Sequence, residues 1–283
     1  MKLISVVTPC YNEEDQVRAL YEATKAVFES LPAYRYEHIF IDNASKDGTV
    51  SRLKELARGD PSVKIIVNTR NFGHIRSPFH GLLQAGGDAA VMMACDFQDP
   101  PILIRDFLEK WEEGYKVVLA VKTAADETAP MFFIRSLYYD LVNRLADIDL
   151  TKNTTGFGLY DQEVLKTLRK IDDPYPYFLG LISDVGYESA KISFRQPERR
   201  SGSTKNNFYT LYDLAMLGIT NHSKVPLRIA TMAGFLMATV SLLVALAYLA
   251  AKLLFWNWFT VGVAPIIISL FFFSSVQLFF IGI

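Results

Sequence analysis

Cysteine, net charge and glycine-rich nucleotide motifs are what this sequence lacks. Its two cysteines, Cys10 and Cys95, lie in different strand-like segments of a chain of 283 residues, which argues against a disulfide framework and fits a reducing compartment. The net charge of −1 gives no global field that attracts nucleic acid, so we expect no nucleic-acid partner. Neither a Gly-x-Gly-x-x-Gly motif nor a Walker P-loop is present, which argues against a dinucleotide enzyme and a P-loop NTPase. The histidines lack zinc-ligand spacing.

A secretory signal is also missing, because the apolar run at Met1–Val7 is short and polar residues follow it closely. The C-terminal part has long apolar stretches instead. Ile229–Ala251 and Leu253–Ile283 contain no charged residue, and the first would span roughly 35 Å as a helix, enough to cross a bilayer. We expect a transmembrane helical hairpin whose far interface carries Trp256, Trp258 and Phe259. The alternative is a hairpin buried in a soluble protein.

Basic residues precede the first of these stretches, whereas the turn between them offers only Lys252. The positive-inside rule therefore predicts a multi-pass protein of the inner (plasma) membrane whose N-terminal domain is cytoplasmic. The basic residues are Arg199, Arg200, Lys205, Lys224 and Arg228. The sequence stops inside an apolar stretch, which suggests that the natural chain continues. Small residues at Gly234–Ala238 leave a homo-oligomer open.

The remaining part of the chain alternates short apolar runs with helix-like segments, which predicts an α/β fold with a mostly parallel sheet covered on both faces. The expected strands are Ile4–Thr8, His38–Asp42, Val63–Val67, Ala89–Ala94 and Lys116–Val121. The expected helices are about 14–31, 48–58, 75–86 and 102–113, with amphipathic helices at 130–150 and 207–222. We therefore divide the chain into a domain at 1–200, a basic loop and juxtamembrane helix at 201–228, and two transmembrane helices at 229–283.

Polar clusters follow four of the expected strands, at the edge where parallel sheets bind ligands. They are Pro9 with Tyr11, Asn12 and Glu13; Asp42 with Asn43; Asn68 to His74; and Asp96 to Asp99. Asp96 and Gln98 offer the hard oxygen ligands that suit Mg²⁺ or Mn²⁺, and such ions commonly bind together with phosphates. Asp42 is placed to accept hydrogen bonds from a base or ribose. Alternatively, Asp99 merely caps a helix that Pro100 or Pro101 opens.

Four segments, taken in order, resemble the motifs of family-2 glycosyltransferases with the GT-A fold. They are Thr8-Pro9-Cys10-Tyr11-Asn12-Glu13-Glu14, Ile41-Asp42-Asn43-Ala44-Ser45-Lys46-Asp47-Gly48-Thr49, Asn71-Phe72-Gly73 and Asp96-Phe97-Gln98-Asp99-Pro100-Pro101. The closer resemblance is to membrane-anchored polyprenyl-phosphate glycosyltransferases, such as dolichol-phosphate mannose synthase and bacterial undecaprenyl-phosphate glucosyltransferases. Arg199–Lys205 is similar to the basic loop of that group, and Val225–Arg228 to its entry into the membrane.

The resemblance implies inverting transfer of a sugar from a nucleotide sugar, expected to be UDP-linked, to a polyprenyl phosphate such as undecaprenyl phosphate. The acceptor phosphate is already largely anionic, so it needs positioning and screening rather than a strong base. Asp96 then carries the metal, and the cations expected at the acceptor phosphate are Lys122, Arg135, Arg199 and Lys205. The residues expected to bind the nucleotide diphosphate are Pro9, Tyr11, Asn12, Glu13, Asp42, Asn71, His74, Asp96 and Asp99.

The sequence departs from the family pattern at several positions. Ala94 replaces the first acid of the Asp-x-Asp motif, and Asn43 replaces the second acid of the Asp-Asp-Gly-Ser turn. Gly156 and Gly158 replace the Asp and Arg of a later Gly-Asp-Phe-Arg pattern, which favours a donor sugar other than the common hexoses. Two alternatives stay open: a glycan-extending membrane glycosyltransferase, and a catalytically weak scaffold that binds a nucleotide sugar.

Overall fold

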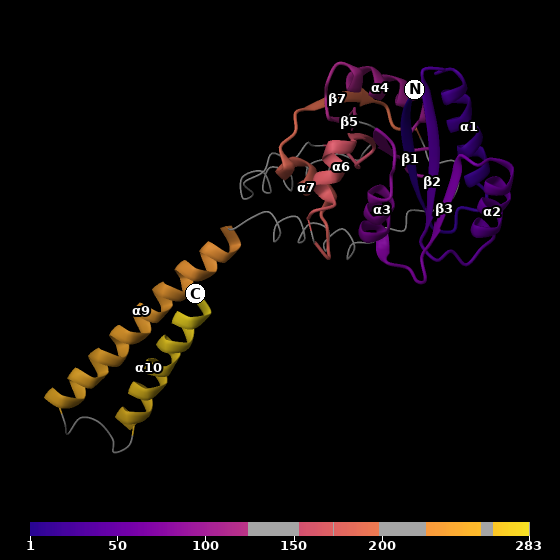
Figure 1. Ribbon diagram of the computed structural model, residues 1–283. Coiled ribbons are helices and arrows are strands. Elements are labelled where there is room, and N and C mark those ends of the chain that lie inside the picture. The colour runs from indigo at the N-terminus through magenta and orange to yellow at the C-terminus, as the bar shows by residue number, and fades with distance from the viewer. Residues whose placement is uncertain (124–152, 172, 198–224, 256–262, 283) are drawn as a thin grey trace. The chain divides into compact units, whose positions relative to one another are not determined.

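The computed structural model describes residues 1–123, 153–171, 173–197, 225–255 and 263–282 (Figure 1). The chain separates into a larger unit, Met1–Asn221, and a smaller unit, His222–Ile283. The amphipathic helices expected at 130–150 and 207–222, and most of the basic loop, lie outside the described residues.

The larger unit is built on a seven-stranded sheet with the order β3-β2-β1-β4-β6-β5-β7. Its strands are β1 (Lys2–Cys10), β2 (Tyr34–Asp42), β3 (Val63–Val67), β4 (Ala89–Met92), β5 (Val117–Lys122), β6 (Gly158–Asp161) and β7 (Ser189–Phe194). All pairings are parallel except those of β6, which runs antiparallel to both β4 and β5. The prediction of a mostly parallel α/β sheet is therefore confirmed.

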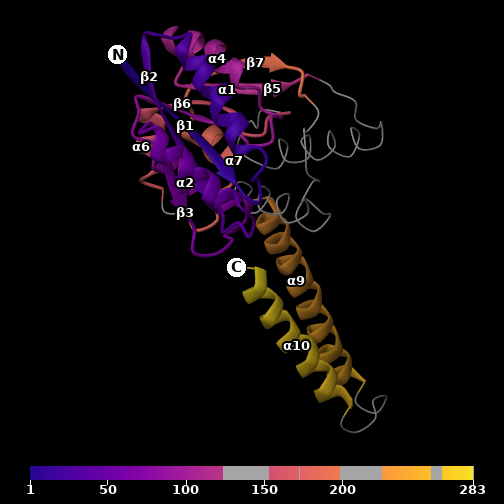
Figure 2. The ribbon, with the colours of Figure 1, turned by 90° about the vertical axis from the view of Figure 1, so that its right-hand side faces the viewer.

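Helices cover both faces of this sheet (Figure 2). They are α1 (Val17–Glu29), α2 (Thr49–Gly59), α3 (Gly73–Leu83), α4 (Ile104–Glu112), α6 (Gln162–Leu168) and α7 (Phe178–Val185), with a 3₁₀ turn η1 (Pro101–Leu103). The core on one face includes Leu20 of α1, Leu53 of α2 and Phe107 of α4. The core on the other face includes Phe79 of α3 and Leu165 of α6. Burial of both faces explains why the strands are continuous apolar runs.

The sequence pattern gave no sign of β6. The strand has only four residues, and its first residue is glycine, which weakens a strand pattern. The structure requires glycine there, because a Cβ on Gly158 would lie 2.2 Å from the Val118 carbonyl oxygen of β5. A second difference is that β4 ends at Met92, two residues before the expected Ala94. The chain therefore leaves the sheet earlier and forms a longer loop before η1.

The smaller unit contains α9 (Val225–Leu254) and α10 (Val263–Gly282), which pack side by side (Figure 1). The buried positions described on α9 are Gly234, Ala238, Ser241 and Ala245. Gly234 and Ala238, which we considered for association between copies, are thus already buried within this chain. One described helical segment, Thr231–Leu254, is long and apolar enough to cross a membrane.

Candidate active site

The loops after β1 and β2 are held to each other at the carboxyl edge of the sheet. The Asn12 backbone N–H donates to Ser45 Oγ (2.8 Å), and Asn12 Oδ1 accepts from the Lys46 backbone N–H (2.8 Å). The Glu13 backbone N–H donates to Thr49 Oγ1 (2.9 Å). Asn12 adopts a φ of 56°, a left-handed conformation that asparagine tolerates better than most residues. The side chain of Asn12 therefore fixes the loop, which the sequence motif alone did not indicate.

Asp42 ends β2 and is completely buried. Its Oδ2 accepts a hydrogen bond from the Ser45 backbone N–H (2.9 Å), whereas Oδ1 has no partner among the described residues. A buried carboxylate oxygen without a donor is costly, and such atoms in native proteins call for an explanation. A donor group on a bound ligand would satisfy it, in line with the base or ribose contact that we expect at this residue.

Asn43 joins the β2 loop to the loop after β3. Its Nδ2 donates to Asn71 Oδ1 (2.9 Å) and to the Gly73 carbonyl oxygen (3.1 Å). Its Oδ1 accepts from the Phe72 backbone N–H (2.8 Å) and from Asn68 Nδ2 (3.2 Å). An aspartate could not donate the first two bonds when ionised. The departure at this position therefore supplies a donor as well as removing a charge.

The loop after β4 carries the predicted metal ligands. Asp96 Oδ1 accepts from the Gln98 backbone N–H (3.1 Å), and the intervening Phe97 adopts a φ of 60°. Asp99 Oδ2 accepts from the Ala94 backbone N–H (2.9 Å), which closes the loop on itself. Asp99 therefore lies inside the loop and does not cap the following helix, so the alternative of a capping role for Asp99 is wrong, whereas Pro101 does open η1.

Asp99 is also electrostatically coupled to its neighbours. Burial raises its pKa to about 6; the Asp96 carboxylate adds to the rise, while the Ala94 hydrogen bond and the charge of Lys122 oppose it. Lys122, at the end of β5, is half-buried, and its backbone N–H donates to the Asn153 carbonyl oxygen (2.9 Å). The structure thus brings Asp96, Asp99 and Lys122 together, as expected from strand ends that share one edge.

Few carboxylates are available to a metal ion here. Within the described ranges, no group of three or more His, Cys, Asp or Glu side chains is arranged to hold one. Mg²⁺ and related ions are often bound by one or two carboxylates, with water and substrate phosphates completing the shell. Asp96, with the amide oxygen of Gln98, fits that mode, and the mutual repulsion of Asp96 and Asp99 favours a nearby cation.

The other residues predicted for nucleotide binding lie along the same edge. Pro9 and Tyr11 are half-buried at the end of β1, and Asn71 accepts hydrogen bonds within the β3 loop. His74 is the second residue of α3; desolvation lowers its pKa, although the residue is exposed overall. The acceptor cations Arg135, Arg199 and Lys205 lie outside the described residues.

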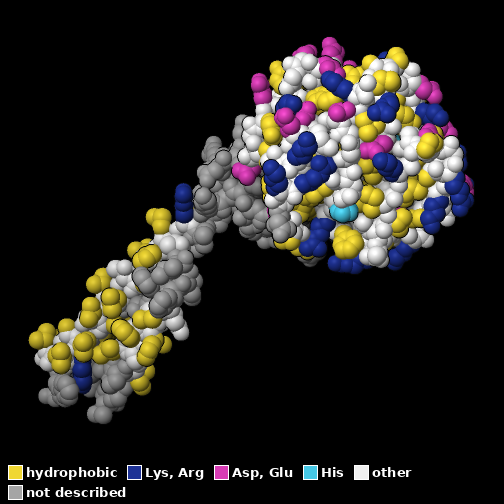
Figure 3. Space-filling model, in the orientation of Figure 1, with side chains coloured by type: hydrophobic (Ala, Val, Ile, Leu, Met, Phe, Trp, Pro, Cys, Tyr) yellow, Lys and Arg dark blue, Asp and Glu magenta, His cyan; other side chains and the backbone are white. Residues whose placement is uncertain are grey.

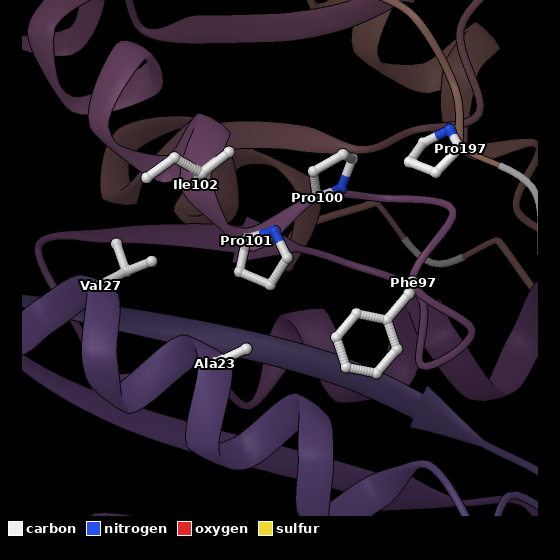
Figure 4. Close-up of a pocket in the computed structure, with 7 residues that line it drawn as sticks. All are labelled: Ala23, Val27, Phe97, Pro100, Pro101, Ile102 and Pro197. Carbon is white, nitrogen blue, oxygen red and sulfur yellow. The ribbon is translucent and has the colours of Figure 1, made fainter. Parts of the chain in front are cut away.

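An apolar hollow adjoins the loop after β4 (Figure 4). In the close-up, the ring of Phe97 extends toward α1, across from Ala23. The lining residues are Ala23, Val27, Phe97, Pro100, Pro101, Ile102 and Pro197. None of them is charged, so this hollow does not suit a diphosphate.

Gly156 and Gly158 permit a backbone conformation and a strand approach that other residues would not. Gly156 has a φ of +88°, and a Cβ there would lie 3.2 Å from Phe178 Cδ1. The Gly156 carbonyl oxygen accepts a hydrogen bond from Tyr160 Oη (2.8 Å). A side chain at 156 would therefore be strained by the positive φ and tight against Phe178, and one at 158 would collide with the backbone of β5, so this backbone disfavours the aspartate and arginine of the family pattern.

Comparison with protein families and curated sequences gives a consistent result. Residues 5–169 match the sequence profile described as "Glycosyl transferase family 2". An uncharacterised glycosyltransferase of Bacillus subtilis, YkcC, is 35% identical, covering 99% of this chain and 86% of its own. The bactoprenol glucosyl transferase of Shigella phage SfV is 33% identical, covering 99% of this chain and 91% of its own.

Solved structures show the same architecture at lower identity. Glucosyl-3-phosphoglycerate synthase of Mycobacterium tuberculosis superposes with a TM-score of 0.53 at 18% identity, covering 77% of this chain and 78% of its own. A crystal structure of that synthase with Mn²⁺ and UDP-glucose gives a TM-score of 0.51 at 17% identity, covering 77% of each chain. At these identities the likeness establishes the fold, which is GT-A.

Proposed function

The chain belongs to glycosyl transferase family 2, and we propose that it transfers a sugar from a UDP-linked donor to a polyprenyl phosphate, with inversion at the anomeric carbon. The observation that carries the proposal is the edge where Asp96, Asp99 and Lys122 meet, in the same unit as the Asp42 carboxylate oxygen that has no partner in the described part of the chain. The polyprenyl acceptor is supported by the name of the relative from phage SfV, a bactoprenol glucosyl transferase.

Mg²⁺ or Mn²⁺ fits the residues at the end of β4. Asp96 and the amide oxygen of Gln98 would hold the ion, and the donor diphosphate would complete its shell. When bound, such an ion neutralises charge on the leaving nucleoside diphosphate. Ala94 contributes no carboxylate, but its backbone N–H holds Asp99, so the loop keeps its shape without the missing acid.

The acceptor phosphate needs placement more than activation. A phosphate monoester has a second pKa of about 6 and already carries the attacking charge at neutral pH. Lys122 offers a point charge beside Asp99. From there its ammonium group would screen the charge of the acceptor phosphate, and it would not act as a base. Arg135, Arg199 and Lys205 are proposed to complete the grip on the acceptor, with arginine able to bind phosphate bidentately.

Recognition of the nucleoside is assigned to the first two strand ends. The buried Oδ1 of Asp42 accepts a donor group of the base or ribose, and the clamped loop of Asn12 and Glu13 forms the wall beside it. UDP is supported by the fold likeness to a synthase crystallised with UDP-glucose. We propose a donor sugar other than the common hexoses, because Gly156 and Gly158 stand where the family pattern has an aspartate and an arginine.

The smaller unit is proposed to anchor the enzyme as a two-helix transmembrane hairpin in the inner membrane, with the larger unit in the cytoplasm. Large apolar side chains on both helices are exposed, among them Phe235, Leu243, Ile266 and Phe273. Lipid would cover these side chains. Left in water, they would form a larger continuous apolar surface than soluble proteins usually expose.

The test is mass spectrometry of lipid products after the full chain is incubated with undecaprenyl phosphate, a divalent cation and a panel of nucleotide sugars. We expect a lipid-linked sugar from wild-type protein and its loss in Asp96→Ala. Asp184→Ala, which removes an exposed acid on α7, is the matched control and should retain activity. Nucleotide-sugar binding with no lipid product under any condition would contradict the proposal and favour a silent scaffold.

A further inference from the structure

Two arginines at the carboxyl edge of the sheet stack on aromatic rings. Arg70 Cζ lies 4.4 Å from the ring centre of Phe72, and Arg76 Cζ lies 3.7 Å from that of Tyr175. Arg76 Nε also donates to the Pro174 carbonyl oxygen (2.9 Å), which ties α3 to the loop before α7. These contacts make a surface of four residues, Arg70, Phe72, Arg76 and Tyr175, which we call the arginine–aromatic surface.

The charge of this surface is not neutralised by the residues that the structure describes. Neither Arg70 nor Arg76 forms an ion pair with a described carboxylate, whereas Arg52 lies within ion-pair distance of two glutamates. The acid of the adjoining loop, Asp173, accepts a hydrogen bond from the Tyr175 backbone N–H (2.8 Å). Figure 3 shows Lys and Arg side chains along the lower margin of the larger unit, with the acidic side chains placed higher.

The rings beneath these cations are partly open to solvent. Tyr175 is 53% exposed, and Phe72 is half-buried. When a guanidinium stacks on a ring, the N–H groups at its edge still point outward and can donate hydrogen bonds to a phosphate. A combination of cation and amphipathic ring is typical of the polar boundary of a bilayer, where the ring lies at headgroup depth.

We propose that the arginine–aromatic surface contacts anionic lipid headgroups of the leaflet that holds the acceptor. This inference rests on the proposed function, because it requires that the substrate phosphate be membrane-borne. The surface shares the carboxyl edge with Asp96 and Lys122, so lipid contact there would direct the catalytic edge toward the acceptor. Each arginine near an anionic surface strengthens association by about fivefold.

The first experiment compares the full chain in detergent micelles with the full chain in vesicles of phosphatidylcholine, with or without phosphatidylglycerol. The test variant is Arg70→Gln/Arg76→Gln. The matched control, Arg35→Gln/Arg58→Gln, removes the same charge from exposed positions at the opposite edge, where β2 begins and α2 ends. In vesicles with phosphatidylglycerol we expect transfer by the test variant, which loses two such arginines, to fall by up to about 25-fold, with the control unchanged.

Micelles separate the lipid role from a nucleotide role. With soluble donor and detergent-dispersed acceptor, the single variant Arg76→Gln, which lies outside the Asn68–His74 cluster, should match wild type in both kcat and donor KM. A raised donor KM in micelles would instead assign the arginines to the donor diphosphate and overturn the proposal. Equal activity of test variant and wild type in every vesicle would overturn it as well.

A second experiment does not depend on turnover. A fluorescent label on Thr69→Cys, next to Arg70, should be quenched by spin-labelled lipids in vesicles that contain phosphatidylglycerol. The same label on Gly59→Cys, where a Cβ meets no neighbour, should not be quenched. If the label at Thr69 is no longer quenched in the Arg70→Gln/Arg76→Gln background, the result supports lipid contact by the arginine–aromatic surface. Equal quenching at Thr69 and Gly59 refutes that contact. If wild-type protein forms no lipid-linked sugar at all, the proposed function fails while this measurement still decides the lipid contact.

Discussion

Replacing Asn43 by aspartate would restore the family pattern, and we predict that it destabilises the protein. Asn43 is 7% exposed and donates two hydrogen bonds, to Asn71 Oδ1 and to the Gly73 carbonyl oxygen. The backbone N–H of Phe72 donates to its Oδ1, which fixes the orientation of the amide. An aspartate would keep the oxygen that accepts from Phe72. Its second carboxylate oxygen would take the place of Nδ2 and face Asn71 Oδ1 and the Gly73 carbonyl oxygen, neither of which can donate a hydrogen bond to it.

The magnitude follows from these contacts. Two lost hydrogen bonds cost about 1 kcal/mol each, and facing the buried acceptors with a charge adds a similar amount, so Asn43→Asp should cost about 2–4 kcal/mol. Desolvation and the facing oxygens raise the pKa of the new carboxyl in the folded state. A raised folded pKa means that the variant binds its proton more tightly when folded. The deficit is therefore small below about pH 4 and grows as the pH rises through the folded pKa.

Thermal unfolding of the full chain in detergent, measured across pH with chelator present, checks this prediction. Asn43→Ala is the control, because it loses the same donated bonds without adding a charge and its deficit should not depend on pH. The reasoning is refuted if Asn43→Asp equals wild type near about pH 8, or if its deficit is the same at all pH values.

Three further predictions concern the same edge. Ala44 has a φ of 61°, so Ala44→Gly should raise the free energy of unfolding by up to about 1 kcal/mol, measured by chemical denaturation. Because the folded pKa of Asp99 is raised to about 6, its ionisation destabilises the metal-free protein. Between about pH 4 and 6, the free energy of unfolding of wild type should fall by about 3 kcal/mol relative to that of Asp99→Asn. A difference in melting temperature that does not change with pH would contradict this. The Cys95 thiol and burial both raise the pKa of Cys10, so a thiol reagent should label Cys10 and Cys95 only after unfolding; labelling of native protein would be the contrary result.

Apolar runs and strand-end polarity were sufficient to predict most of the sheet and the edge that carries the site. Val63–Val67 is observed with the predicted bounds, and β2 ends at Asp42 as expected. The reason is that parallel strands buried on both faces must be apolar throughout, and their carboxyl ends must share one edge. The joint position of Asp96, Asp99 and Lys122 follows from that topology.

Contacts between loops could not be read in the same way. Asn43 and Gly73 are 30 residues apart in the chain, and nothing in either motif indicates that one donates to the other. Arg76 and Pro174 are 98 residues apart, and their hydrogen bond depends on how the loop before α7 returns to α3. Local patterns predict elements, whereas pairings of this kind depend on the packed fold.

The departures at 156 and 158 show why a missing side chain is not always a missing function. Gly158 lets β6 approach the backbone of β5, and the positive φ of Gly156 turns the chain so that its carbonyl oxygen meets Tyr160. An arginine at 158 would collide with the Val118 carbonyl oxygen, and an aspartate at 156 would be strained and would press on the Phe178 ring. Restoring the family pattern therefore requires a shift of the backbone at residues 156–158 as well as the two side chains. Substituting the side chains alone should not recreate the site of relatives that carry them, so the proposed difference in donor sugar follows from the missing side chains together with the backbone that excludes them.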